Sequence, residues 1–153
     1  MSVHPARIVA SLALLAGGFI VGVSVFAIVV AKVLVDAGMV IRPSDAALLR
    51  DLVPVLPFIG GFAVASLLGG IALLLERNAA DALAIGTAVV GVTVGAIGTA
   101  LVVVGRDPLA HAGSSPSDGI GILAVFTAIY ATVIVAILAA RTRSAGRSSQ
   151  AVA

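Results

Sequence analysis

Residues 8–31 read IVASLALLAGGFIVGVSVFAIVVA, and none of them carries a charge. Arg7 precedes this run and Lys32 follows it. The hydrocarbon core of a bilayer is about 30 Å thick, and a helix needs ~20 apolar residues to cross it. The run exceeds that minimum and is bounded by charge at both ends. It therefore predicts a transmembrane helix.

Three further runs have the same character. They lie at residues 52–75, 82–104 and 120–140, and each is free of charged residues. Over the whole chain 61% of the residues are hydrophobic and 10% are charged, whereas a soluble domain carries roughly 25% charged residues. The sequence therefore predicts an all-α integral membrane protein with four transmembrane helices.

These runs form one predicted domain, residues 1–140. The basic tail, residues 141–153, has little apolar surface to bury, so we expect it to be disordered. A cleaved signal peptide is the alternative for the first run, but such peptides have an apolar region of only about 7–15 residues. We therefore expect the first run to be retained as a span.

The connectors predict how the spans are joined. Only residues 76–81 separate the second run from the third, which forces an antiparallel helical hairpin. Residues 45–53 place apolar side chains on one side, as expected for a short interfacial helix in the first outer connector. Pro54 and Pro57 open the second run, where proline costs least in a helix. Together these features predict an antiparallel up-down bundle.

The basic residues predict the orientation, because they concentrate in cytoplasmic loops. With both termini in the cytoplasm, five basic residues lie inside and four outside. The inner ones are Arg7, Arg77, Arg141, Arg143 and Arg147. We therefore expect cytoplasmic termini. Arginine far outnumbers lysine, and Ala, Val and Gly are abundant, which is typical of GC-rich bacterial genomes and favours a bacterial plasma membrane.

Each run carries small residues at intervals of four. Lipid supplies no hydrophobic force between helices, so small residues that allow close backbone approach form helix-packing interfaces. The residues predicted to do this are Gly18, Gly22, Gly61, Ala65, Gly69, Thr87, Gly91, Gly95, Thr99, Ala124, Ala128 and Thr132. Two interpretations stay open: the rows pack within the bundle, or they form a specific interface with another copy or another membrane protein.

The sequence offers few groups for catalysis or ligand chemistry. Ionisable side chains at membrane depth mark proton relays and coupled transport, and none lies within the four runs. His4 and His111 fall outside them, without spaced partners for a metal site. Cysteine is absent, which removes thiolate chemistry. We expect no catalytic residue, no cofactor, no metal and no enzymatic activity.

The net charge of +2 does not indicate nucleic acid as a partner. The basic residues are scattered at the ends of the runs, and the chain has no Trp. Nucleic-acid-binding grooves combine clustered positive charge with aromatic side chains on which bases stack. The expected partners are the lipid bilayer and other membrane helices, and no nucleic acid.

The sequence favours a non-enzymatic multi-pass membrane protein that acts through helix packing, as an accessory or assembly subunit or as a homo-oligomer. The alternative is an oligomeric channel, a holin-like pore or a passive facilitator, because hydroxyls and backbone carbonyls alone can line a pore. Thr87, Thr93 and Thr99 in the third run would supply such a lining.

Overall fold

The computed structural model describes residues 5–40, 43–75, 79–104 and 116–150. Within these ranges every regular element is a helix, and no strand occurs. In chain order the elements are α1 (Pro5–Asp36), α2 (Pro43–Leu52), the 3₁₀ helix η1 (Val53–Val55), α3 (Leu56–Leu74), α4 (Ala80–Val103) and α5 (Pro116–Gln150). The all-α prediction is confirmed for the described residues.

Four stretches of helix are long and apolar enough to cross a membrane. They are Pro5–Asp36, Leu49–Leu74, Ala80–Val103 and Ile120–Thr142, which confirms the predicted number of such helices within the described ranges. Large apolar side chains point away from the protein: Phe19, Phe26 and Phe58 are 67%, 69% and 80% exposed. Soluble proteins rarely expose apolar surface on this scale, so these helices suit a lipid surrounding.

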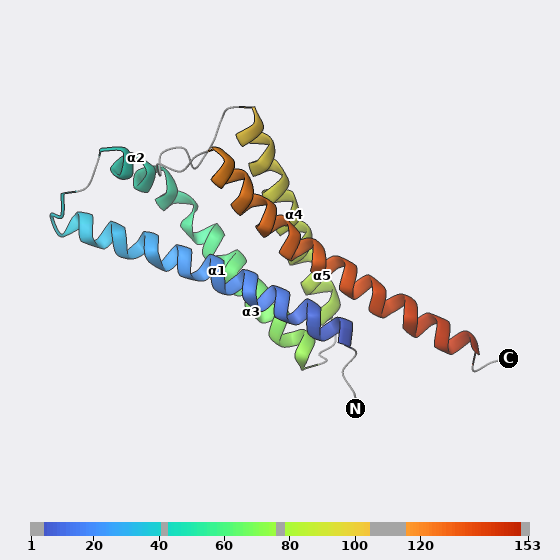
Figure 1. Ribbon diagram of the computed structural model, residues 1–153. Coiled ribbons are helices and arrows are strands. Elements are labelled where there is room, and N and C mark those ends of the chain that lie inside the picture. Colours follow the sequence, from blue (N-terminus) through green and yellow to red (C-terminus); the bar gives the residue numbers. More distant parts are fainter. Residues whose placement is uncertain (1–4, 41–42, 76–78, 105–115, 151–153) are drawn as a thin grey trace.

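Helix α5 continues beyond the expected fourth span. We expected a disordered tail from residue 141, but the backbone stays helical through Gln150. This segment lacks proline, and it is rich in basic residues. Arginine is a good helix former, and cations near a helix C-terminus interact favourably with its dipole. The extension runs out past the other helices (Figure 1).

The second span begins in a jointed segment made of α2, η1 and α3. Pro54 lies in η1, and Pro57 lies in the first turn of α3. Proline lacks an N–H and clashes with the preceding turn of an α-helix, so the chain tightens into a 3₁₀ turn between two α-helices. The joint lets α2 turn back to contact α1 at the far end of that helix (Figure 1).

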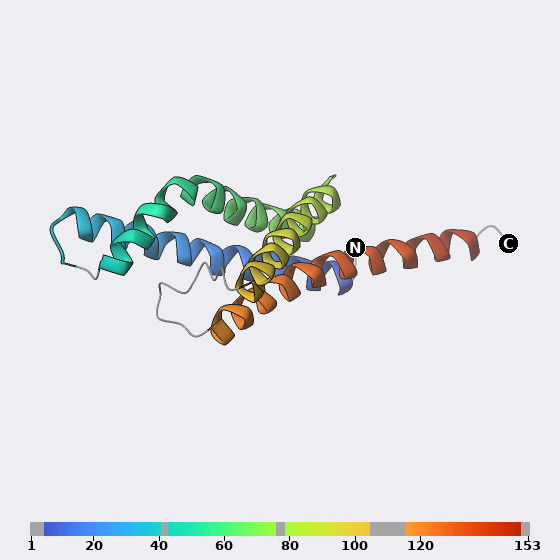
Figure 2. The same ribbon diagram turned by 90° about the horizontal axis from the view of Figure 1, so that it is seen from above.

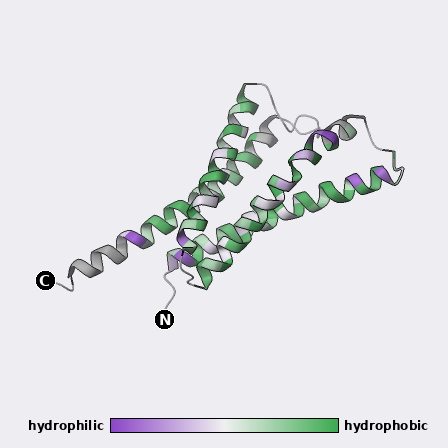
Figure 3. Cartoon of the chain, turned by 180° about the vertical axis from the view of Figure 1, so that it is seen from behind, coloured by the Kyte–Doolittle hydropathy of each residue, from purple (hydrophilic) through white to green (hydrophobic). Residues whose placement is uncertain are grey.

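The long helices associate as two pairs. Helix α1 packs mainly on α3, and α4 mainly on α5, while smaller contacts join α1 to α5 and α3 to α4. The pairs meet near the start of α1 and diverge toward its far end (Figures 1 and 2). Hydrophilic residues gather near the ends of the long helices, with mostly apolar residues between them (Figure 3).

The buried core lies where the two pairs meet. Its largest fully buried side chains are Tyr130, Leu14, Leu73, Ile137 and Val133, with the hydroxyl residues Ser11 and Ser66 among them. Helix α4 contributes small residues to this core, Ala80, Ala84 and Ala88. The core therefore fills with large side chains from α1, α3 and α5, set against a smooth face of α4.

Candidate functional site

Helices α1 and α3 approach closely at glycines. A Cβ atom added at Gly18 would lie 2.9 Å from the Ser66 Cβ and 3.0 Å from the Ala63 carbonyl oxygen. Further along the same contact, the Ser11 hydroxyl donates a 2.7 Å hydrogen bond to the Gly70 carbonyl oxygen. Any side chain larger than hydrogen at Gly18 would push the two helices apart.

Helices α4 and α5 approach through a second row of glycines. A Cβ atom added at Gly91 would lie 2.5 Å from Cγ of Tyr130. A Cβ atom at Gly95 would overlap the Thr127 hydroxyl. As residue numbers rise along α4 the contacted residues fall along α5, so the two helices run in opposite directions.

Tyr130 joins all four long helices from its place on α5. Its ring lies on Gly91 of α4, and its hydroxyl would be 2.7 Å from a Cβ atom at Gly17 of α1. The same hydroxyl is 2.9 Å from Oγ of Ser66 on α3, in a buried hydrogen bond. A fully buried Tyr needs such a partner for its O–H group. Tyr130 is therefore the central packing residue of the core.

Two phenylalanines complete this aromatic cluster. The ring centroid of Tyr130 is 5.2 Å from that of Phe62 and 4.8 Å from that of Phe126, with the rings tilted by 52° and 53°. Tilted rings at such distances attract through their quadrupoles. Sequence reasoning did not single out Tyr130. The available signal was that it is the only Tyr in a chain without Trp.

The predicted small-residue rows divide between inward and outward positions. The buried members are Gly18, Gly69, Thr87, Gly91 and Gly95; the half-buried ones are Gly22, Ala65 and Thr99; the exposed ones are Gly61, Ala124, Ala128 and Thr132. A Cβ atom at Gly22 or Gly61 would meet no other atom within 4 Å. The α1 and α3 rows therefore pack over only part of their length, whereas Ala124, Ala128 and Thr132 of α5 face outward.

Most hydroxyls in the spans bond within their own helix. Thr93 donates to the Val89 carbonyl at 2.9 Å, and Thr99 donates to the Gly95 carbonyl at 2.9 Å. Such bonds to the carbonyl four residues earlier need no partner helix. Thr87 is buried while Thr93 is exposed, so the threonines of the third span do not share one face.

An ion cluster joins three helices where the pairs meet. Asp81, in the first turn of α4, accepts a hydrogen bond from Arg7 of α1 at 2.6 Å. Its other carboxylate oxygen is 3.4 Å from Nε of Arg141 on α5. The side chains of Arg7 and Asp81 are only about a quarter exposed. The shared carboxylate holds the ends of α1, α4 and α5 together.

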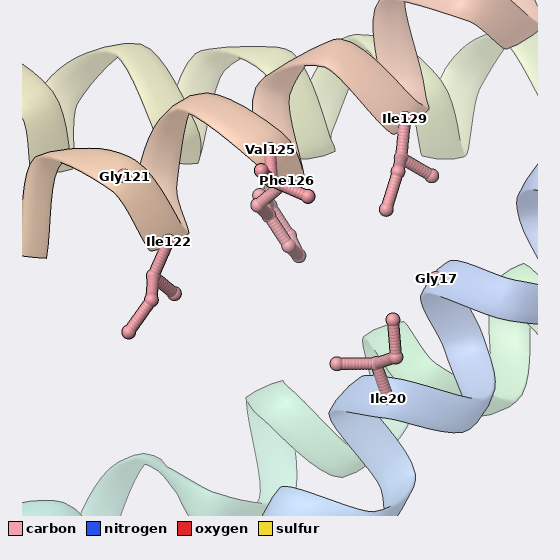
Figure 4. Close-up of a pocket in the computed structure, with 7 residues that line it drawn as sticks. All are labelled: Gly17, Ile20, Gly121, Ile122, Val125, Phe126 and Ile129. Carbon is pink, nitrogen blue, oxygen red and sulfur yellow. The ribbon is translucent and has the colours of Figure 1, made fainter. Parts of the chain in front are cut away.

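An apolar groove opens between α1 and α5, where the two pairs begin to separate. Its volume is about 290 Å³, and its lining residues are Gly17, Ile20, Gly121, Ile122, Val125, Phe126 and Ile129. Figure 4 shows the α5 side chains pointing across the groove toward α1. The lining has almost no polar surface, so the groove suits hydrocarbon.

The described residues provide packing and ion pairs more than reactive groups. Among them, no three His, Cys, Asp or Glu side chains are placed to hold a metal ion. Neither a protein-family model, nor a curated protein, nor a solved structure matches this chain.

Proposed function

We propose that this protein crosses a membrane four times as an antiparallel up-down bundle and acts without catalysis, by packing an outward helix face against a partner's transmembrane helix. The partner-binding face is defined by Gly121, Ala124, Ala128 and Thr132 of α5. The partner is another membrane protein or a second copy of this chain.

The contacts between helices support the up-down arrangement. Contacts between α1 and α3, and between α4 and α5, run in opposite chain directions. Arg7, Asp81 and Arg141 meet at one end of the molecule, whereas Lys32 lies near α2. With both termini in the cytoplasm of a bacterium, the ion cluster lies at the inner surface of the plasma membrane and α2 lies along the outer surface.

One contrast carries the proposal for partner binding. Three members of the row on α4 are buried, Thr87, Gly91 and Gly95, and the two glycines pack against α5. The row on α5 has the same four-residue spacing, yet Ala124, Ala128 and Thr132 are exposed. Successive members of such a row drift by only about 40° around a helix, so they present one smooth strip. Smooth strips are the surfaces through which membrane helices associate.

The position of the strip adds a second reason. Gly121 belongs to the strip and also lines the apolar groove between α1 and α5. A Cβ atom at Gly121 would meet nothing within 4 Å. A helix lying on the strip would therefore border the groove, and bulky side chains of that helix could fill it.

Photo-crosslinking tests the face directly. A photoreactive residue at Ala124 should capture a partner in intact membranes, and a product of twice the 15.0 kDa chain mass would identify a second copy. Ala128→Leu, which makes the strip bulky, should abolish the captured product. Ala96→Leu is the matched control, because Ala96 is an exposed alanine on α4. It should leave the product unchanged.

The proposal fails if Ala128→Leu and Ala96→Leu give equal capture at Ala124. If both variants lost the captured product equally, any added bulk in the spans would disturb the protein, and the α5 face would not be specific.

An oligomeric pore stays as the alternative, but Thr87 and Thr93 lie on different sides of α4. No specific observation favours that pore.

A further inference from the structure

A second pocket lies at the opposite end from the ion cluster, between the end of α1 and the α2–η1 joint. Its volume is about 210 Å³, and it is lined by Lys32, Val35, Ala46, Leu49, Arg50, Val53 and Pro54. Apolar side chains from both segments form its walls. Two cations, one from α1 and one from α2, share the same lining. The pocket is therefore apolar inside with positive charge at its boundary.

Each of the two cations has a carboxylate beside it. Lys32 donates hydrogen bonds to both carboxylate oxygens of Asp36. Nε of Arg50 is 3.8 Å from a carboxylate oxygen of Asp51, which is an ionic contact too long for a hydrogen bond. All four side chains are well exposed. These four residues, which we call the charged rim, carry two positive and two negative charges.

We propose that this pocket binds a zwitterionic phospholipid with a primary-amine headgroup, of the phosphatidylethanolamine class. The phosphate lies between Lys32 and Arg50, the ammonium lies near Asp36 and Asp51, and part of an acyl chain enters the pocket. The site rests on the proposed placement of α2 at the membrane surface, but it does not depend on the α5 face.

Charge complementarity selects this occupant. A phosphate oxygen accepts charge-assisted hydrogen bonds from Lys and Arg, which are stronger than neutral ones. A primary ammonium carries three N–H donors for the two carboxylates. A choline headgroup has the same charge but no N–H donor, and a glycerol headgroup has no cation. An anionic lipid would therefore place its charge beside two carboxylates that it cannot satisfy.

The apolar lining of the pocket favours an amphiphile over a soluble anion. Val35, Leu49 and Val53 form its apolar walls, and these would gain nothing from a phosphate alone. Burying hydrocarbon against such walls contributes about 25 cal/mol for each Å² removed from water. With α2 along the membrane surface as proposed, the end of α1 lies at the depth of the lipid headgroups.

Lipid retention by native mass spectrometry tests the headgroup preference on the wild-type protein. The purified protein in mild detergent is mixed with phosphatidylethanolamine, phosphatidylcholine and phosphatidylglycerol that have identical acyl chains. Phosphatidylethanolamine should bind about tenfold more tightly than the other two, as expected when about 1.4 kcal/mol of charge-assisted hydrogen bonding is gained. Equal retention of the three lipids, or preference for phosphatidylglycerol, would overturn the proposal.

Variants of the charged rim test the contacts of the lipid ammonium and of the lipid phosphate separately. The double variant Asp36→Asn/Asp51→Asn should lose the preference for ethanolamine over choline and bind phosphatidylglycerol more tightly. The double variant Lys32→Gln/Arg50→Gln should weaken the binding of all three lipids. Unchanged retention in both double variants would show that the lipid lies elsewhere.

Filling the pocket supplies a test that leaves every charge in place. Ala46→Leu adds bulk to the lining and should lower retention of all three lipids, whereas Ala96→Leu on α4 should not. Equal effects of the two substitutions would contradict the pocket as the binding site. Partner capture at Ala124 is measured separately, so either proposal can fail while the other stands.

Discussion

The ring of Tyr130 lies directly on the backbone of Gly91, with no space between them for a side chain. A Cβ atom at Gly91 would be 2.5 Å from Cγ of the ring and 2.7 Å from Cδ2. Real Cβ atoms essentially never come that close to a neighbour. The glycine therefore sets the separation of α4 and α5, and it also allows the Tyr130 hydroxyl to reach α1 and α3.

Gly91→Ala should destabilise the protein although alanine is the better helix former. The added methyl group must displace a ring that is enclosed by three other helices, and overpacking of this kind costs about 1–3 kcal/mol. Thermal unfolding in mild detergent, followed by circular dichroism, measures the change. Gly86→Ala is the control on the same helix, because a Cβ atom there meets nothing within 4 Å. That variant should be as stable as the wild type or more stable, and an equal loss in both variants would contradict the packing role of Gly91.

Removing the hydroxyl of Tyr130 should lower the free energy of unfolding less than Gly91→Ala does. Tyr130→Phe leaves the ring in place and deletes the 2.9 Å hydrogen bond to Ser66. Hydrogen bonds between membrane helices contribute about 0.6 kcal/mol on average and at most about 1.7 kcal/mol. A double-mutant cycle with Ser66→Ala measures the free energy that this hydrogen bond contributes, since each single change removes the same bond. A coupling energy of zero would mean that the two hydroxyls do not stabilise each other.

Asp81→Asn should loosen the end of the molecule where α1, α4 and α5 meet. The amide keeps the shape of the carboxylate but removes the charge that faces Arg7 and Arg141. Exposed ion pairs contribute about 0.2–1 kcal/mol, and this partly buried cluster should reach the upper part of that range. Asp51→Asn is the control, because that side chain is 75% exposed and its pair with Arg50 is long. Unfolding at low salt should separate the two variants, and a high salt concentration should reduce the difference. If Asp51→Asn proves the more damaging change, the Asp81 cluster does not hold this end together.

The proposed orientation predicts a labelling pattern in intact cells. Cysteine at Val40, which is 98% exposed beyond the end of α1, should react with an impermeant maleimide. Cysteine at Thr142 should react only after the membrane is permeabilised. The chain has no cysteine of its own to interfere. The reverse pattern would place both termini outside the cytoplasm.

Reconstitution into liposomes distinguishes partner binding from conduction. Vesicles that contain the purified protein should leak ions and small solutes no faster than empty vesicles. Thr93→Val serves as the companion variant, because Thr93 is the exposed threonine of the third span. A leak in the wild type that this variant abolishes would favour the pore over the partner-binding protein.

The spans were predictable because they depend on run length and charge alone. Arg7 and Lys32 enclose a run that no soluble helix would carry, and the structure places a helix there. The spacing of Gly91 and Gly95 puts both on one face of a helix, and both are buried in the structure.

The inward face of each helix was harder to predict. In a soluble helix the apolar stripe marks the core, but all faces of these spans are apolar, so the contrast is lost. The rows on α4 and α5 therefore look alike in sequence, although the α5 row faces outward at Ala124, Ala128 and Thr132. The role of Tyr130 could not be predicted for a related reason. Its partners Gly17, Ser66 and Gly91 come from three other helices, and spacing along the chain does not predict which residues of different helices come into contact.

The divergence of the two helix pairs makes the molecule wider at one end than at the other (Figure 1). The pairs meet near the start of α1, where Asp81 contacts Arg7 and Arg141, and they separate toward the far end of that helix (Figure 1). In the proposed transmembrane placement, the four helices would spread over a wider area in one leaflet than in the other (Figure 1). A flat membrane must stretch or compress one leaflet to accept this wedge, whereas a membrane bent toward the narrow side accepts it without strain. Copies gathered in one place would therefore favour curvature of a fixed sign.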